Sequence, residues 1–158
     1  MNNPNLNLGG TINLANVLIK AGTTTTYDLE ASSCVIDGKF AVILAASDTR
    51  AAPTTDANTG VAFVTVADDK GCVLVVGVPA AGVAISVIQG DIKDMEVGTL
   101  EFITAPPFPS LPADFCPIGY VVCKNDSGSD YIPGTTSWTA IDVTFVDIAM
   151  MPDRPQES

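Results

Sequence analysis

Short runs of β-branched and other apolar residues, separated by turn signals, constrain the fold of this chain most. Residues 33–36 and 39–46 are two such runs, and Asp37-Gly38 stands between them. Asp-Gly between two strands is the strongest short signal for a hairpin, because both central turn positions need a positive φ. The segment therefore predicts a β-hairpin.

A second hairpin and several further strands are predicted along the rest of the chain. Residues 60–67 and 72–78 flank a turn at 68–71, where Gly71 can take the left-handed conformation of a hairpin loop. For residues 12–19 we favour a strand or an extended arm over a short helix. The other predicted strands are 23–29, 83–88, 99–104, 118–124, 131–138 and 141–149.

Three segments are predicted to connect these strands. Polar residues 47–59 predict a solvent-facing loop, and 89–98 predict a connection in which one helical turn is an open alternative. Residues 105–117 contain five prolines, a density that excludes a central strand or a helix. This proline-rich segment is expected to pack onto another part of the chain through its apolar residues Phe108, Leu111 and Phe115.

These patterns predict an all-β fold, an antiparallel β-sandwich or β-barrel of about eight to ten short strands. Many strands are near-continuous apolar runs, so we expect both faces to be covered, by a second sheet inside and a neighbouring subunit or arm outside. Residues 1–22 are predicted as an extended N-terminal arm, since residues 1–11 are uncharged and rich in Asn and Gly. The β-domain is placed at 23–149 and a loose tail at 150–158.

The charge of the chain excludes several classes of partner. Its 18 acidic and 7 basic residues give a net charge of −11. A phosphate backbone would be repelled by this surface, so nucleic acid is not expected as a partner, and anionic membranes are disfavoured for the same reason. There is no signal-peptide pattern and no run of about 18 apolar residues, so we expect synthesis in a cytosol and no membrane span.

No residue pattern points to catalysis, and we expect a protein that is not an enzyme and holds no cofactor or metal. The chain has no histidine to act as a base, and the dinucleotide and Walker motifs are absent. The pairs Asp68-Asp69 and Asp91/Asp94 could support acid–base chemistry, but a turn is the favoured interpretation of Asp68-Asp69. Residues 125–130 slightly resemble a calcium loop, and a solvated turn is favoured there too.

The four cysteines are predicted to be buried, reduced thiols, because unpaired Cys is among the most buried residue types. Their spacing does not fit a zinc site. A disulfide between Cys116 and Cys123 is an open alternative. The cysteines are Cys34, Cys72, Cys116 and Cys123.

The order of features along the chain resembles a class of virion proteins. After the polar arm come GKFAVILAA and GVAFVTVADDKGCVLVVGV, then the proline-rich APPFPSLPADFCPIGYVVCK, and finally PGTTSWTAIDVTFVDI. Over roughly residues 33–148 this order resembles the head decoration (cement) or head-fibre proteins of tailed bacteriophages. The four cysteines depart from what that class leads us to expect.

The resemblance implies a β-sandwich or β-barrel that binds the outer surface of the major capsid protein shell, as a homotrimer or other homo-oligomer. It implies assembly in the host cytoplasm and a final location on the exterior of the capsid. An uncharged arm can add a strand to an exposed sheet edge of another subunit. The candidate partner-binding residues of the arm are Leu6, Leu8, Ile12, Leu14 and Val17.

The alternative function is a receptor- or glycan-binding module of a phage fibre or tail. Such a module needs aromatic platforms, and Tyr131 with Trp138 could form a surface aromatic site. The simpler interpretation is that Trp138 packs against a sheet, because large aromatic side chains mainly serve packing.

Overall fold

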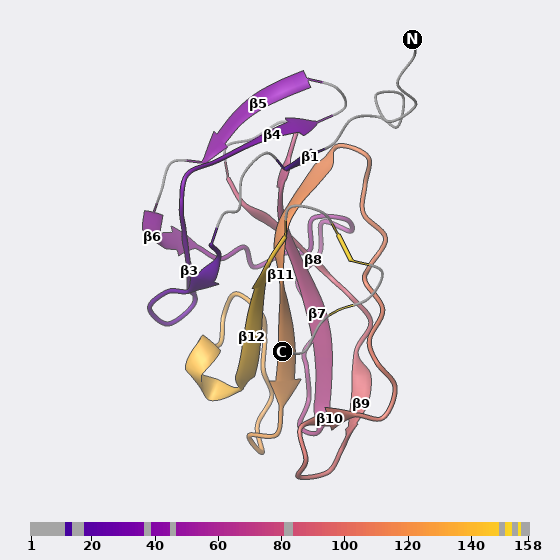
Figure 1. The fold of residues 1–158 in the computed structure, drawn as a ribbon. Helices are drawn as coiled ribbons and strands as arrows, with labels where there is room; N and C mark the ends of the chain where they lie inside the picture. Colours follow the sequence, from indigo (N-terminus) through magenta and orange to yellow (C-terminus); the bar gives the residue numbers. More distant parts are fainter. Residues whose placement is uncertain are drawn as a thin grey trace.

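The structure is a computed structural model that describes residues 12–13, 18–36, 39–44, 47–80, 84–148, 151–152 and 155. Within these residues the fold is nearly all β, as predicted, with twelve strands and one 3-10 helix (Figure 1). Strands β1, β2 and β10 are only two residues long. The elements are β1 (Ile12–Asn13), β2 (Lys20–Ala21), β3 (Thr26–Leu29), β4 (Ser32–Ile36), β5 (Lys39–Leu44), β6 (Ser47–Ala51), β7 (Lys70–Pro79), β8 (Ser86–Gln89), β9 (Lys93–Glu96), β10 (Glu101–Phe102), β11 (Phe115–Asn125), η2 (Trp138–Ala140) and β12 (Asp142–Asp147).

Two long antiparallel strands, β7 and β11, form the centre of the main sheet. They pair along their whole length, from Phe115 opposite Pro79 to Asn125 opposite Lys70. Strand β12 pairs with the other edge of β11, while β8 and β9 both pair with β7 and β10 pairs with β9. Every residue of β7 between its two ends is buried. The apolar runs therefore mark strands that are covered on both faces, as predicted.

Alternate residues of β7 belong to two separate apolar clusters. Leu74 and Val76 lie in the first cluster, whereas Val73 and Val75 lie in the second. This alternation follows from the two-residue period of a strand. Two three-stranded sheets, β1-β4-β5 and β2-β3-β6, contribute residues such as Cys34 to the first cluster. These two small sheets thus cover one face of the main sheet.

The other face of the main sheet is covered by the proline-rich segment of the same chain. Phe108 and Leu111 pack against the second cluster and Phe115 belongs to it, which confirms the predicted packing. The rings of Phe108 and Tyr120 meet edge-on, with centroids 5.0 Å apart. Met151, from the tail that we predicted to be loose, also packs there. The outer covering was expected from a neighbouring subunit or arm, but on this face the proline-rich segment of the same chain supplies it.

The hairpin predicted around Asp37-Gly38 is confirmed. Strands β4 and β5 pair antiparallel, from Ser32 opposite Leu44 to Ile36 opposite Lys39. The Asp-Gly turn itself lies outside the described residues. Figure 1 shows this hairpin at one end of the molecule, opposite the end where β9 and β10 lie.

Residues 60–67 do not form the predicted strand. Within the described residues, the only β-pairing of this segment consists of two isolated bridges, Ala62 with Thr55 and Val66 with Tyr131. Phe63 and Val66 are buried, while Val61 and Val64 are exposed. These two buried residues are three positions apart, whereas the side chains of a strand return to the same face every two residues. The second predicted hairpin is therefore wrong, although its second half is β7.

Two further predictions are wrong. Residues 47–51 form β6, which pairs with β3, although a loop was predicted over 47–59. A polar strand is tolerated at a sheet edge, where charged and polar side chains are common. Residues 131–138 are mostly turns that lead into η2, because Gly134 takes a positive φ and Ser137 caps the helix. Only the later predicted strand, now β12, is present.

The strands around residue 90 agree only in part with the predictions. Strand β8 occupies 86–89, where 83–88 were predicted. The predicted connection 89–98 contains β9 rather than a helical turn, and Met95 of β9 is buried. Only two residues of the predicted strand 99–104 pair with β9.

Strand β11 begins before the predicted strand 118–124 and includes Pro117. Its register with β7 shifts between Pro117 and Gly119, which marks a β-bulge. Proline has no N–H to donate, and it is tolerated inside a sheet at such a bulge. The bulge also changes which residues face the first cluster, Cys116 before it and Val121 after it.

Part of the segment predicted as an N-terminal arm belongs to the folded body. Strand β1 pairs with β4, and β2 pairs with β3. Ile19 is buried in the first cluster, and its backbone N–H donates to the carboxylate of Asp147. Burial raises the pKa of Asp147, and this hydrogen bond opposes the rise. Residues 1–11 lie outside the described residues.

We expect truncation of Trp138 to destabilise the protein, because its ring connects β3 to β12. Its indole N–H donates to the carbonyl of Thr26 at 2.9 Å, and its ring meets Tyr27 and Phe145 edge-on. Trp138→Ala should lower the free energy of unfolding by about 3–5 kcal/mol, measured by urea titration. Val97→Ala, at a residue 76% exposed, is the control and should stay within about 0.5 kcal/mol. A loss below about 1 kcal/mol at Trp138 would contradict this packing role.

Candidate interaction surface

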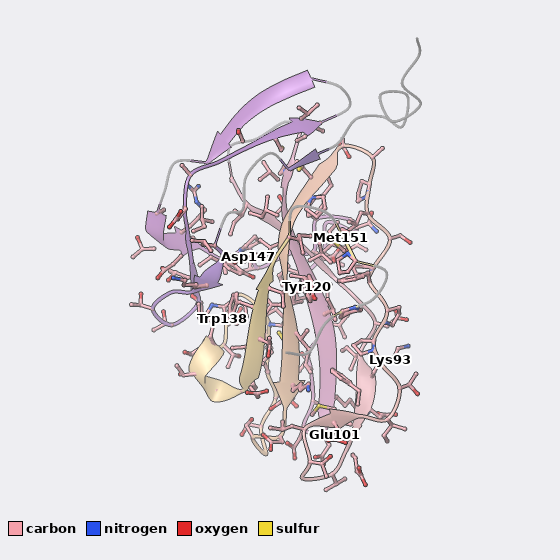
Figure 2. The ribbon with its side chains drawn as sticks, in the orientation of Figure 1. Lys93, Glu101, Tyr120, Trp138, Asp147 and Met151 are labelled. Carbon is pink, nitrogen blue, oxygen red and sulfur yellow. The ribbon has the colours of Figure 1, made fainter. Side chains whose placement is uncertain are left out.

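The candidate surface aromatic site is buried. Tyr131 and Trp138 are 1% and 2% exposed, and both belong to the first apolar cluster. Their ring centroids are 6.2 Å apart. Figure 2 shows Trp138 between η2 and the N-terminal strands. The interpretation of these residues as a surface site is wrong, because both rings are used for packing in the core.

The hydroxyl of Tyr131 has no hydrogen-bond partner among the described residues. Burial raises the pKa of Tyr131, and the nearby Cys123 adds to the rise. The phenol is therefore neutral at physiological pH. A buried hydroxyl without a hydrogen-bond partner lowers the free energy of unfolding. The hydroxyl of Tyr131 therefore destabilises the core.

Only one of the candidate partner-binding residues of the arm lies within the described residues. The backbone of Ile12 pairs with Val35 of β4. The interactions of the others remain predictions, since these residues lie outside the described part of the chain: Leu6, Leu8, Leu14 and Val17.

The candidate carboxylate pairs have separate structural partners. Asp68 accepts a hydrogen bond from the backbone N–H of Gly128 at 2.8 Å, within the turn region where it was predicted. Asp91 pairs with Lys93 at 3.2 Å. Asp94 pairs with Lys70, and this hydrogen bond lowers the pKa of the Asp94 carboxyl. Each of these three carboxylates is therefore held by its own partner.

The loop at 125–130 is organised by its first residue. Asn125 is fully buried, and its amide donates to the carbonyls of Val66 and Ser129, both at 2.8 Å. Its side-chain oxygen accepts from the hydroxyl of Ser127 at 2.7 Å and from the backbone N–H of the same residue at 3.2 Å. This oxygen, which a cation would need, is occupied by bonds within the loop. The geometry agrees with the interpretation of a turn.

The described residues contain no group of three or more Cys, Asp or Glu side chains that is placed to hold a metal ion. None of their helices has the length and apolar character needed to cross a membrane.

A groove lies beside the outer edge of the main sheet, where the sequence predicted no site. It has a volume of about 360 Å³ and is lined by residues of the segments 56–64 and 89–92. Two smaller hollows adjoin it, one against 107–110 and one against Ile103 and Thr104. All three share residues of the stretch 89–94, so they follow one edge of the sheet. Figure 2 shows Lys93 on this side of the molecule.

Asp56 fixes the segment that forms one wall of the groove. One carboxylate oxygen accepts from the backbone N–H groups of Asn58 and Thr59, both at 2.9 Å. The other oxygen accepts from the backbone N–H of Gln89 at 2.7 Å. This buried carboxylate therefore closes its own loop and fastens that loop to β8. In the local sequence D-A-N-T, the Asp carboxylate stands two and three residues before the N–H groups that donate to it, and this spacing favours the turn.

Gln89 holds the same wall at a second point. Its side-chain oxygen accepts from the backbone N–H of Val64 at 2.7 Å, and its side-chain nitrogen donates to the carbonyl of Val64 at 2.9 Å. This pair of bonds imitates the pairing of one strand residue with another. The amide of Gln89 thus replaces the strand that residues 60–67 do not form.

The fixed backbone leaves apolar side chains facing outward along the groove. Val61 and Val64, which line it, are 62% and 63% exposed, and Ile103 in the adjoining hollow is 69% exposed. Isolated exposed apolar residues are ordinary, whereas exposed apolar residues in adjoining hollows along one sheet edge make this groove a candidate interaction site. The sequence signal that could have revealed them is the three-residue spacing of Phe63 and Val66, which turns Val64 outward.

Comparisons with protein-family models, with curated proteins and with solved structures find no significant match to this chain.

We expect Asp56→Ala to release this wall and destabilise the fold. The substitution leaves several backbone donors without a partner, among them the N–H of Gln89. Hydrogen bonds to a charged group contribute about 1.5–3 kcal/mol each, so the free energy of unfolding should fall by about 3 kcal/mol. Asp91→Ala, at an exposed carboxylate of the same groove, is the matched control and should change it by less than about 0.5 kcal/mol. Equal effects of the two variants in urea titrations would contradict the role assigned to Asp56.

Proposed function

We propose that this chain is a structural virion protein that decorates and stabilises a phage capsid. It binds the outer surface of the major capsid protein shell through the groove at the sheet edge. The observation that carries the proposal is the pair Val61 and Val64, exposed on a wall that Asp56 and Gln89 hold in place. The order of sequence features, which resembles decoration and head-fibre proteins, supplies the class of partner.

A fixed apolar surface suits a structural contact. Because the wall is already held by hydrogen bonds, little conformational entropy is lost when a partner covers it. Complete burial of a valine side chain contributes about 1.5–3 kcal/mol. Two valines therefore contribute a useful part of the binding free energy of each copy, and several copies in one homo-oligomer would bind the shell multivalently.

The charges around the groove also suit contact with another protein. Although the whole chain carries a net charge of −11, the carboxylates of Asp91 and Asp94 are paired with Lys93 and Lys70. Two carboxylates along this edge are therefore each paired with a lysine, while the acidic residues elsewhere keep the unassembled chain dispersed. A polar rim around an apolar centre is the usual anatomy of a protein–protein interface.

The N-terminal arm is the second element of the proposal. Strand β1 fixes Ile12 to β4, so residues 1–11 start from an anchored point of the body. We propose that this arm lies along a capsid or decoration subunit, in a homotrimer or other homo-oligomer on the exterior of the virion. The receptor- or glycan-binding alternative has no observation in its favour, because Tyr131 and Trp138 are buried.

We expect charge placed in the groove to prevent decoration. The double variant Val61→Asp, Val64→Asp should bind expanded capsids, assembled from the major capsid protein of the same genome, at least about 100-fold more weakly, since about 3 kcal/mol is lost. Co-sedimentation measures this binding. Val97→Asp, at a valine that is also largely exposed but lies in the turn between β9 and β10, is the matched control and should bind normally. Normal binding by the double variant would exclude the groove, and absence of the chain from purified virions would exclude the function.

Removal of residues 1–11 should weaken capsid binding without unfolding the body. The described fold begins with β1 at Ile12, so the truncated chain keeps every residue that the structure places in the two apolar clusters. The arm can add backbone hydrogen bonds to an exposed strand edge of a neighbour, and these bonds would be lost. Thermal unfolding monitors the fold, and co-sedimentation monitors binding. A truncated chain that coats capsids as well as the full chain would show that the arm has no binding role.

A further inference from the structure

The four cysteines, for which the proposed function has no use, form two pairs in the structure. Cys72 of β7 stands directly opposite Cys123 of β11 in the central ladder. Cys34 of β4 and Cys116 of β11 lie in the same apolar cluster, where β4 contacts β11 and each thiol shifts the pKa of the other. All four are buried in the first apolar cluster as reduced thiols, which confirms the prediction of buried, unpaired cysteines.

The pairing differs from the disulfide that the sequence left open. Cys116 and Cys123 lie on the same extended strand, and seven residues at about 3.3 Å each place them roughly 23 Å apart. A disulfide needs Cα atoms about 4.4–6.8 Å apart, so these two cysteines cannot be joined. Directly opposed residues of an antiparallel ladder have Cα atoms about 4.5–5.5 Å apart, and Cys72 and Cys123 are such residues.

We propose that the chain has two disulfide sites, Cys34 with Cys116 and Cys72 with Cys123, which form when the chain meets a small-molecule disulfide such as oxidised glutathione. The thiolate of one cysteine attacks a sulfur of oxidised glutathione, so that one glutathione leaves and a mixed disulfide remains. The second cysteine, as thiolate, attacks the protein sulfur of that mixed disulfide, and the second glutathione leaves. Each bond removes two protons and two electrons from the protein, and one oxidised glutathione becomes two reduced molecules.

Burial sets the rate of this reaction. Removal from water raises the pKa of Cys34 and of Cys116. The pKa of Cys123 is raised mainly by its hydrogen bond with Cys72 and then by burial. Thiolate is the reactive form, so these groups react slowly while the fold is closed. Oxidation therefore proceeds through transient opening of the structure. In a reducing cytosol the thiols persist, and in an oxidising medium the disulfides accumulate.

The bond between Cys34 and Cys116 would have a particular structural effect. Cys34 belongs to the small sheet β1-β4-β5, and Cys116 lies on the central strand β11. A covalent link would fasten the hairpin end of the molecule to the main sheet. The second bond would join the two central strands themselves. Both bonds close long loops, which is the case in which a disulfide restricts the unfolded chain most.

The experiment incubates the purified, reduced full chain with oxidised glutathione at mildly alkaline pH, in urea just below the unfolding midpoint, and then alkylates remaining thiols. Intact mass should show a loss of four hydrogen atoms, and peptide mapping should identify Cys34–Cys116 and Cys72–Cys123. The oxidised chain should have a higher urea midpoint than the reduced chain, and a reductant should remove the difference.

A matched variant separates the two sites. Cys34→Ala, which keeps a small apolar side chain in the core, should still form Cys72–Cys123 and should leave Cys116 open to alkylation after denaturation. Persistent thiols, stable glutathione adducts or any other connectivity in the native chain would overturn the proposal. A lower midpoint after oxidation would overturn the stabilising role. None of these outcomes depends on capsid binding, so the disulfide proposal is tested independently of the proposed function.

Discussion

The pairing of β7 with β11 is the interaction on which the rest of the structure depends. These strands are the longest of the fold, and their residues supply both apolar clusters. Their outer edges pair with β12, β8 and β9. The two small sheets pack on one face of the pair, and the proline-rich segment packs on the other. Because both strands are buried on both faces, each added layer removes apolar surface from water, which is the main stabilising contribution in such a core.

The sequence predicts those parts of the fold that depend on neighbouring residues. Asp37-Gly38 between two apolar runs locates the hairpin β4–β5, and the run that became β7 is recognisable by its continuous apolar character. The packing of the proline-rich segment also follows from composition, since prolines exclude regular structure while Phe108 and Leu111 must be buried. In each case the signal and the structure lie within a few positions of one another.

Features that depend on distant residues could not be predicted in this way. Residues 60–67 have the composition of a strand, but Gln89, twenty-five positions beyond Val64, binds their backbone instead. The bulge at Pro117 inverts the inward and outward positions of β11, and no local pattern reveals this. The groove arises from these long-range bonds, so it too was missed. The favoured interpretation of Trp138 as a packing residue is confirmed, whereas the alternative of a surface site with Tyr131 is wrong, since composition alone does not distinguish an aromatic platform from a core.

The bonds of Gln89 have a consequence for the behaviour of the chain in concentrated solution. An uncovered strand edge is a template on which identical chains can stack into fibrils, and a chain that is 47% apolar is exposed to that hazard. The side-chain amide of Gln89 occupies the N–H and the carbonyl of Val64, while Asp56 and Ala57 bond the outward backbone groups of Gln89 and Val87 in β8. These bonds thus close this side of the main sheet to edge-to-edge pairing with a second copy of the chain.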